Sequence, residues 1–146
     1  MGIIIDVNIA LKFFFDHEKS DWMEAYNAII NGRCCLHYGG KLIEEYQKLS
    51  SVWKIILQLD RAGRAKLAPK QIVEKETKYL IQKSACISND YHIIALARVS
   101  GARLLCSDDV KLGEDFKNKK WIDKPRGKIY KNATHKKLLK KRCNKC

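Results

Sequence analysis

Four acidic residues on four separate segments of the chain have the chemistry of a metal centre: Asp6, Glu45, Asp90 and Asp108. Clustered carboxylates repel one another and raise each other's pKa, so such a cluster persists when it holds a cation. Ligand sets made only of oxygen favour Mg²⁺ or Mn²⁺. We therefore predict that these residues bind one of these ions if the fold brings them together.

Two of the acids follow segments that have the pattern of buried strands. Asp6 lies near the end of the apolar run "GIIIDV", and Asp108 follows "RLLCS". Parallel sheets place their functional sites beyond the carboxyl ends of the strands. An aspartate there also commonly caps the next helix, and "DDVKLGEDF" predicts that Asp108 or Asp109 does so. Asp6 is harder to explain in this way, because an unpaired carboxylate beside a buried strand is costly.

Asp90 continues an apolar helical stripe. Asp90, Ile93, Ile94 and Ala97 follow the i, i+3, i+4, i+7 spacing, which turns Asp90 toward the buried face. The alternative is a favourable charge at the amino end of the helix, and both roles are compatible. His92 lies away from this stripe, so we expect it at the surface or in an interface.

Glu45 is distinguished from Glu44 by the helix predicted over residues 41–60. At about 100° per residue, Glu45 lies roughly 65° from the centre of the apolar face and Glu44 roughly 165°. Glu45 is therefore the acid that reaches inward, although a glutamate at the rim could also hold only a lysine. The apolar face is defined by Leu42, Tyr46, Leu49, Trp53 and Ile56.

The alternation of strand and helix patterns predicts an α/β fold around a mostly parallel sheet. Strands are expected at residues 2–7, 33–38 and 103–107, with a last edge strand at "KWID". Pro69 is expected to open a helix that runs to about Lys83. We assign residues 1–130 to one domain and residues 131–146 to a basic tail, which is expected to be partly disordered.

The charge is concentrated at the carboxyl end of the chain. The net charge is +13, and residues 117–146 contain 13 of the 29 Lys and Arg residues but only one of the 16 acids. Such a segment attracts polyanions, of which nucleic acid is the commonest. A solubilising tail and an arm for an acidic protein are the alternatives.

The cysteines and the apolar runs bear on location. No run approaches the length of a transmembrane helix, and no secretory signal is evident. A cytoplasmic location is therefore expected. The cysteines, among them Cys34 and Cys106, are expected to be reduced thiols. Cys143 and Cys146, together with His135, could form part of a zinc site, but free thiols on the tail are the stronger expectation.

Taken in order, these pieces resemble the PIN domain family of nucleases. "IIIDVNIAL" resembles its opening strand, "GKLIEEY" its helix with an inward glutamate, and "NDYHIIALARVSGARLLCSDD" its later helix, strand and Ser/Thr-Asp. "KPRGKIY" resembles its closing stretch. The resemblance covers residues 3 to about 130 and implies a three-layer α/β/α sandwich with a parallel sheet.

The resemblance also implies roles for individual residues. Asp6, Glu45, Asp90 and Asp108 match the catalytic acids of the family, with Asp6, Asp90 and Asp108 as the principal metal ligands. Asn8 and Ser107 match supporting positions, and Asp109 could share the metal or replace Asp108. The basic residues predicted to contact nucleic-acid phosphates are Lys124, Arg126 and Lys128.

The implied function is metal-dependent hydrolysis of RNA. The resemblance also allows the role of toxin in a toxin–antitoxin pair, with a small antitoxin and a homodimer as expected partners. Three alternatives stay open. The first is a catalytically silent module that binds nucleic acid, and the second is a DNA-directed nuclease on the same scaffold. The third is a phosphate-accepting receiver domain, which carries its acidic doublet early in the chain rather than late.

Overall fold

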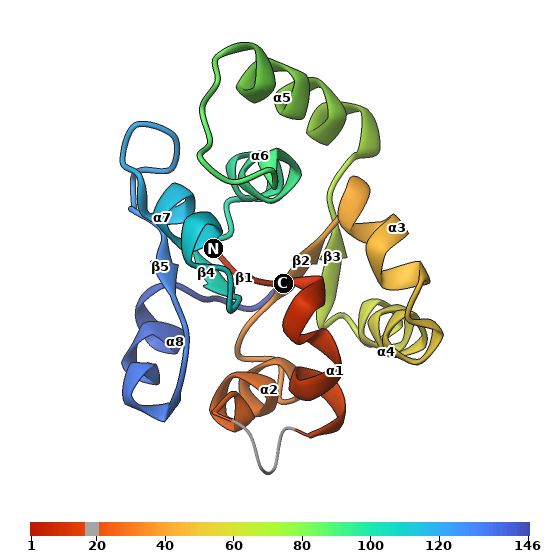
Figure 1. The fold of residues 1–146 in the computed structure, drawn as a ribbon. Coiled ribbons are helices and arrows are strands. Elements are labelled where there is room, and N and C mark those ends of the chain that lie inside the picture. Colours follow the sequence, from red (N-terminus) through yellow and green to blue (C-terminus); the bar gives the residue numbers. More distant parts are fainter. Residues whose placement is uncertain (17–20) are drawn as a thin grey trace.

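The computed structural model describes residues 1–16 and 21–146, and it has an α/β fold around one parallel sheet (Figure 1). The strand order is β3-β2-β1-β4-β5, and every pairing is parallel. β1 is therefore central, and the order reverses between β1 and β4. The predicted α/β fold is confirmed. The strands are β1 (Ile3–Ile5), β2 (Leu36–Tyr38), β3 (Ala65–Leu67), β4 (Leu104–Cys106) and β5 (Lys128–Ile129).

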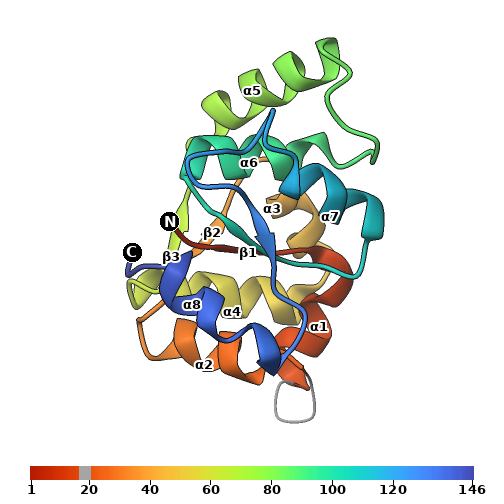
Figure 2. The same cartoon turned by 90° about the vertical axis from the view of Figure 1, so that its left-hand side faces the viewer.

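Helices cover both faces of the sheet and give the expected three layers. α5 and α6 lie on one face, and α1, α2 and α4 lie on the other (Figures 1 and 2). Within the described ranges, no helix is both long and apolar enough to cross a membrane. The helices are α1 (Val7–Phe15), α2 (Met23–Ile30), α3 (Lys41–Gln47), α4 (Ser50–Arg61), α5 (Lys70–Gln82), α6 (Tyr91–Ser100), α7 (Val110–Lys117) and α8 (Lys137–Lys141), with a 3₁₀ segment η2 (Ala133–His135).

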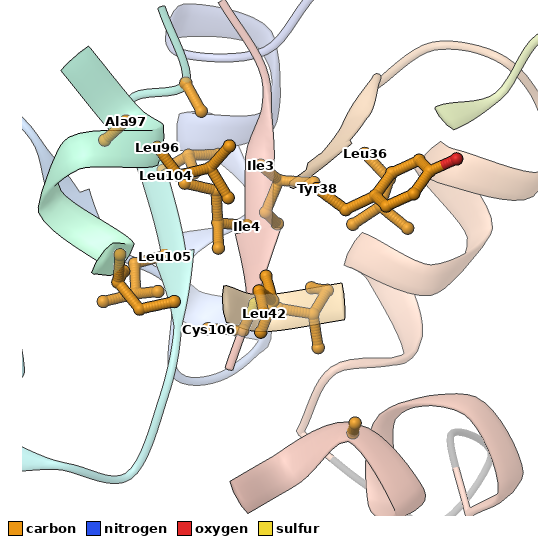
Figure 3. Close-up of a cluster of buried hydrophobic side chains, with 14 of the residues drawn as sticks. Ile3, Ile4, Leu36, Tyr38, Leu42, Leu96, Ala97, Leu104, Leu105 and Cys106 are labelled. Carbon is orange, nitrogen blue, oxygen red and sulfur yellow. The ribbon is translucent and has the colours of Figure 1, made fainter. Parts of the chain in front are cut away.

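The central strands are buried on both faces, which explains their unbroken apolar sequences. Ile3 pairs with Leu104, and Ile5 pairs with Cys106. Figure 3 shows the side chains of β1 and β4 packed against those of α6 and of the start of α3. Because burial leaves these strands a single register, the residues that directly follow β1 and β4 are brought side by side.

The predicted helix over residues 41–60 is in fact two helices. α3 ends at Gln47 and α4 begins at Ser50, with Leu49 in a non-helical conformation between them. The break lets Tyr46 insert fully into the core, where its hydroxyl donates a hydrogen bond to the Ile5 carbonyl, while α4 buries a separate stripe against the sheet. That stripe consists of Val52, Ile56 and Leu59.

Two strand assignments differ from the sequence-based expectation. The last strand is at Lys128–Ile129 rather than at "KWID", because the backbone amides of Trp121 and Ile122 instead donate to Asn118 in a turn after α7. β3 was not predicted. It is an edge strand of three residues in which Lys66 and Leu67 are exposed, so no apolar alternation marks it in the sequence.

The C-terminal segment, residues 131–146, folds against the domain. It contains η2 and α8, and disulfides join Cys34 to Cys143 and Cys35 to Cys146. The expectation of reduced thiols at Cys34 and on the tail is therefore wrong, and the bridges leave no thiolate of Cys143 or Cys146 for the alternative zinc site. The fold brings these cysteines together, because the Asn144 backbone forms hydrogen bonds with both Cys35 and Met1 and so places the tail cysteines beside the start of β2. Cys106 is free and buried, as predicted.

The connection from β2 to α3 depends on two glycines. Gly39 and Gly40 have φ values of 156° and 59°, a region that L side chains rarely adopt. A Cβ on Gly40 would also lie 2.7 Å from Val73 Cγ1 in α5. The glycines therefore let α3 turn sharply at the end of β2 and carry its side chains over the end of the sheet.

Gly40→Ala should destabilise the protein by more than backbone strain alone. Gly63→Ala is the matched control, because Gly63 has φ +73° but no atom within 4 Å of an added Cβ. The control should cost about 1–2 kcal/mol from its positive φ, and Gly40→Ala should cost about 1–3 kcal/mol more, from overpacking and from a ψ of −141° that side chains other than glycine rarely adopt. Urea denaturation of both variants measures the difference, and equal costs would show that the contact with Val73 does not constrain α3.

Candidate metal and nuclease site

The candidate site lies at the carboxyl edge of the sheet, where the strand order reverses. Asp6 directly follows β1, and Ser107 directly follows the neighbouring β4. The Ser107 hydroxyl donates a hydrogen bond of 2.6 Å to Asp6 Oδ2. This is the position at which open parallel sheets bind their ligands, and the contact gives Ser107 the supporting geometry that was expected of it.

Asp6 is a buried carboxylate that is not used as a helix cap. Its side chain is 6% exposed, and although it occupies the N-cap position of α1, it makes no side-chain capping bond. Burial raises the pKa of the Asp6 carboxyl. Hydrogen bonds from Ser107 and from the Val7 backbone lower it, and the charges of Asp90 and Glu45 raise it further. The capping alternative therefore fails for Asp6, and its carboxylate lies among like charges.

Asp90 shows the same pattern from the opposite side of the site. It is the N-cap residue of α6, its side chain is half-buried, and it makes no side-chain capping bond. Burial raises the pKa of Asp90 most, and the charges of Asp109 and Glu45 also raise it, whereas His92 and Lys41 lower it. Acids from four segments thus share one electrostatic neighbourhood, in which Asp109 stands instead of the predicted Asp108.

Glu45 faces this neighbourhood from α3. Glu44 is exposed and Glu45 is half-buried, as the helical wheel indicated. The adjacent Tyr46 fixes α3 to the end of β1 through the Ile5 carbonyl. Glu45 Oε1 lies 2.7 Å from His92 Nε2, so the glutamate is held by a histidine rather than by a lysine.

The expectation for His92 is wrong. The residue is 4% exposed, because α3 and α5 both pack against α6 and all residues from His92 to Ala97 are buried. The helical wheel assumed that one face of this helix was open to solvent. His92 therefore acts inside the protein, where it orients Glu45.

One member of the aspartate doublet caps the next helix, as predicted, and it is Asp109. Asp108 is exposed, whereas Asp109 is half-buried and is the one whose charge raises the pKa of Asp90. The Asp109 backbone donates to Ser107 Oγ, and Asp109 Oδ1 caps α7 by accepting from the Leu112 amide. A carboxylate has about four lone-pair positions, so capping and ion binding are compatible at Asp109.

Asp115 supports the site and was missed from the sequence. This 4% exposed carboxylate accepts hydrogen bonds from the Ile87 amide and from both the amide and hydroxyl of Ser88, at 2.7–3.0 Å. Ser88 Oγ in turn accepts from the Asp90 amide at 3.3 Å. Asp115 thus fixes the segment that presents Asp90. Its spacing from Leu112, on the buried stripe of α7, was the available signal.

Other predicted residues lie away from the carboxylates. Asn8 is exposed in the first turn of α1 and makes no hydrogen bond to the described acidic side chains. Lys128 lines a groove that reaches Ser107 and Asp109. Lys124 lines a separate hollow near Arg103, at the opposite edge of the sheet, and Arg126 donates its Nε to the Lys117 carbonyl. The structure therefore separates the three predicted basic residues.

Comparisons of the chain with protein-family models, with curated proteins and with solved structures give no match. Within residues 1–16 and 21–146, no three Asp, Glu, His or Cys side chains are already arranged to hold a metal ion. The donor set nevertheless suits a hard cation, because Asp6 is a buried carboxylate next to like charges whose cost a cation would remove.

Asp6→Asn should stabilise the protein in the absence of metal. The folded-state pKa of Asp6 is raised, so this group makes the folded state less stable as the pH rises from its ordinary value of 3.8 through the raised pKa, and the full cost is present at neutral pH. The uncharged amide avoids that cost and can still accept from Ser107. In EDTA at neutral pH, the melting temperature should be higher than that of the unmodified protein, and the gain should shrink toward pH 3.

The same pair of proteins should respond oppositely to Mn²⁺. At 100 times its dissociation constant, an ion that binds only the folded state adds about 2.7 kcal/mol to the stability of the unmodified protein, and Asp6→Asn should lose most of this. Asp123→Asn removes the same charge from an exposed position before β5 and should behave as the unmodified protein. A Mn²⁺ effect that survives in Asp6→Asn would exclude Asp6 as a ligand.

Proposed function

We propose that the chain is a metal-dependent nuclease that hydrolyses phosphodiester bonds, with RNA as the substrate implied by the PIN-like sequence pattern. The observation that carries the proposal is Asp6, a buried carboxylate at the end of the central strand that caps no helix and is surrounded by the charges of Asp90 and Glu45. Stability alone gives no reason to bury like charges together, whereas binding of a divalent cation does.

We assign Asp6, Asp90 and Asp109 as the residues that would hold Mg²⁺ or Mn²⁺. Asp109 takes the place predicted for Asp108, since Asp109 is the member of the doublet that is electrostatically coupled to Asp90. When bound, such an ion lowers the pKa of a coordinated water and offsets the negative charge that develops on the phosphate.

The residues around the carboxylates orient them. The Ser107 hydroxyl fixes one Asp6 oxygen, and Asp115 holds the segment that carries Asp90 through Ser88. His92 holds Glu45 at the rim of the site, from which Glu45 can accept a proton from an attacking water or orient it. Mutation of such supporting partners typically reduces metal affinity or activity 10–100-fold.

A catalytically silent nucleic-acid-binding protein is the second candidate. It is favoured by the observation that two of the acids already have partners in the protein: Glu45 pairs with His92, and Asp109 caps α7. A DNA-directed nuclease on the same scaffold differs from the main proposal only in substrate. The toxin role, with its antitoxin partner and homodimer, rests on the sequence resemblance alone.

The disulfides bear on where the protein works. Disulfides are rare in proteins of a reducing cytoplasm and persist in oxidising surroundings. The two bridges Cys34–Cys143 and Cys35–Cys146 therefore fit poorly with the cytoplasmic location that the cysteine content and the absence of an evident signal sequence predicted.

Cleavage of a labelled RNA in Mn²⁺ should depend on Asp109 and not on Asp108. Asp6→Asn, Asp90→Asn and Asp109→Asn should each reduce the rate by about 100-fold or more, since each removes a charged oxygen that would hold the ion. Asp108→Asn, the matched neighbour, should stay within about threefold of the unmodified protein. Rates are measured by gel electrophoresis with single-stranded RNA and DNA in parallel, and EDTA should stop the reaction.

Four outcomes would change the assignment. Full activity of Asp6→Asn would remove the metal site from the mechanism. RNA binding without cleavage in Mg²⁺ or Mn²⁺ would support the silent module, and cleavage of DNA alone would change the substrate class. Loss of cleavage in Asp108→Asn, with cleavage retained in Asp109→Asn, would show that Asp108 is the metal ligand, as the sequence predicted.

A further inference from the structure

A groove leads away from the carboxylates along the outer edge of the sheet. It has a volume of about 550 Å³, and its walls are α7, the edge strand β5 and the start of the C-terminal segment. Ser107 and Asp109 are among its lining residues, whereas Asp6, Glu45 and Asp90 are not. The groove thus adjoins the proposed catalytic site and lies beside β5, an edge strand of the sheet.

The groove has a positive net charge. Among the described residues that line it, four lysines stand against two acids, Asp109 and Glu114, and one histidine, His135. Two of the lysines come from the domain and two from the C-terminal segment, so neither part alone makes the positive surface. The lysines are Lys117, Lys128, Lys131 and Lys137.

Few noncovalent contacts hold the C-terminal wall of this groove against the domain. α8 is five residues long, too short to be stable as an isolated helix. Leu138 and Leu139 pack partly on the core, His135 accepts a hydrogen bond from the Lys131 amide, and Arg142 Nε donates to the Arg126 carbonyl at 3.3 Å. The segment leaves β5 at the carboxyl ends of the strands. It finishes at their amino ends, beside the start of β2.

The two disulfides fix the far end of that wall. Each bridge joins residues more than 100 positions apart, with separations of 109 and 111. Cross-links over loops of this length remove a large part of the freedom of the open chain. The bridges close at the opposite end of the strands, so they fix the part of the segment that follows α8 (Figure 2).

We propose that this groove binds the phosphate backbone of a single-stranded nucleic acid and leads it to the carboxylates, and that the disulfides keep the groove complete. The inference rests on the proposed nuclease function for the destination of the strand. Lysines in a narrow groove match the spaced charges of a backbone without reading bases. The groove exists in full only while the Cys34–Cys143 and Cys35–Cys146 bridges are intact.

The test is the salt dependence of binding, measured by fluorescence anisotropy with labelled single-stranded RNA and DNA. The Asp6→Asn chain in EDTA is used so that neither cleavage nor metal contributes. Four contacts with a single strand give a slope of about −2.8 in log affinity against log salt, which is about a 50-fold loss from 50 to 200 mM salt. RNA and DNA should bind alike.

Removal of two groove lysines should flatten this dependence. Lys131→Gln/Lys137→Gln should lower the slope to about −1.4, about a sevenfold loss over the same salt range. Lys140→Gln/Lys141→Gln is the matched control, because it removes the same charge from the same segment at exposed positions outside the groove. An equal change in both variants would overturn the groove, as would polyglutamate that competes as well as the oligonucleotide.

Opening the bridges should have the same effect as removing the lysines. Cys143→Ser/Cys146→Ser should lower the slope to about −1.4, with trypsin cutting faster after Lys136 and Lys137. Near-UV circular dichroism reports whether the domain stays folded, and if it does not, the lysine variants alone decide the groove. A folded variant with the slope of the parent would show that the bridges do not maintain the groove.

The nuclease proposal and the groove fail separately. Binding that depends on Lys131 and Lys137 in a protein without Mn²⁺-dependent cleavage would retain the groove and reject the nuclease. Cleavage by the unmodified chain, with a salt slope that Lys131→Gln/Lys137→Gln leaves unchanged, would retain the nuclease and reject the groove.

Discussion

Electrostatic repulsion among buried carboxylates at the carboxyl edge of the sheet is the constraint around which this protein is arranged. The central strand ends in Asp6, whose pKa is raised by burial and by the charges of Asp90 and Glu45. Much of the surrounding structure holds these groups in place against that repulsion. Ser107 binds Asp6, His92 binds Glu45, and the turn after β2 carries Glu45 over the end of the sheet. A cation would convert an unfavourable cluster into a favourable one.

The parts of this arrangement that depend on one element alone could be read from the sequence. The apolar run before Asp6 marked the central strand, and the helical period separated Glu45 from Glu44. The parts that depend on how elements meet could not. His92 is buried because a second helix encloses α6, and the choice between Asp108 and Asp109 depends on the path of the chain after β4, which a difference of one residue decides. β3 is short and half-exposed, so no local signal identified it.

The C-terminal segment shows how charge and covalent links combine. Its composition predicted affinity for polyanions, and its low apolar content predicted disorder. The vicinal pair Cys34 and Cys35 and the terminal pair Cys143 and Cys146 change that conclusion, because they tie the segment to the start of β2. Their pairing was invisible in the sequence, since only the fold brings residues more than 100 positions apart together. Charge that would otherwise be diffuse becomes one wall of a groove beside the carboxylates.

The central claim is that these acids share one ion, and a crystal soaked in Mn²⁺ tests it most directly. Anomalous scattering should place an ion at the ends of β1 and β4, with oxygens of Asp6, Asp90 and Asp109 at about 2.1 Å, the distance typical of small hard cations. The Asp6→Asn crystal, treated in the same way, should show no ion there. Manganese bound only elsewhere on the chain, or an unmodified site that stays empty at millimolar Mn²⁺, would contradict the account.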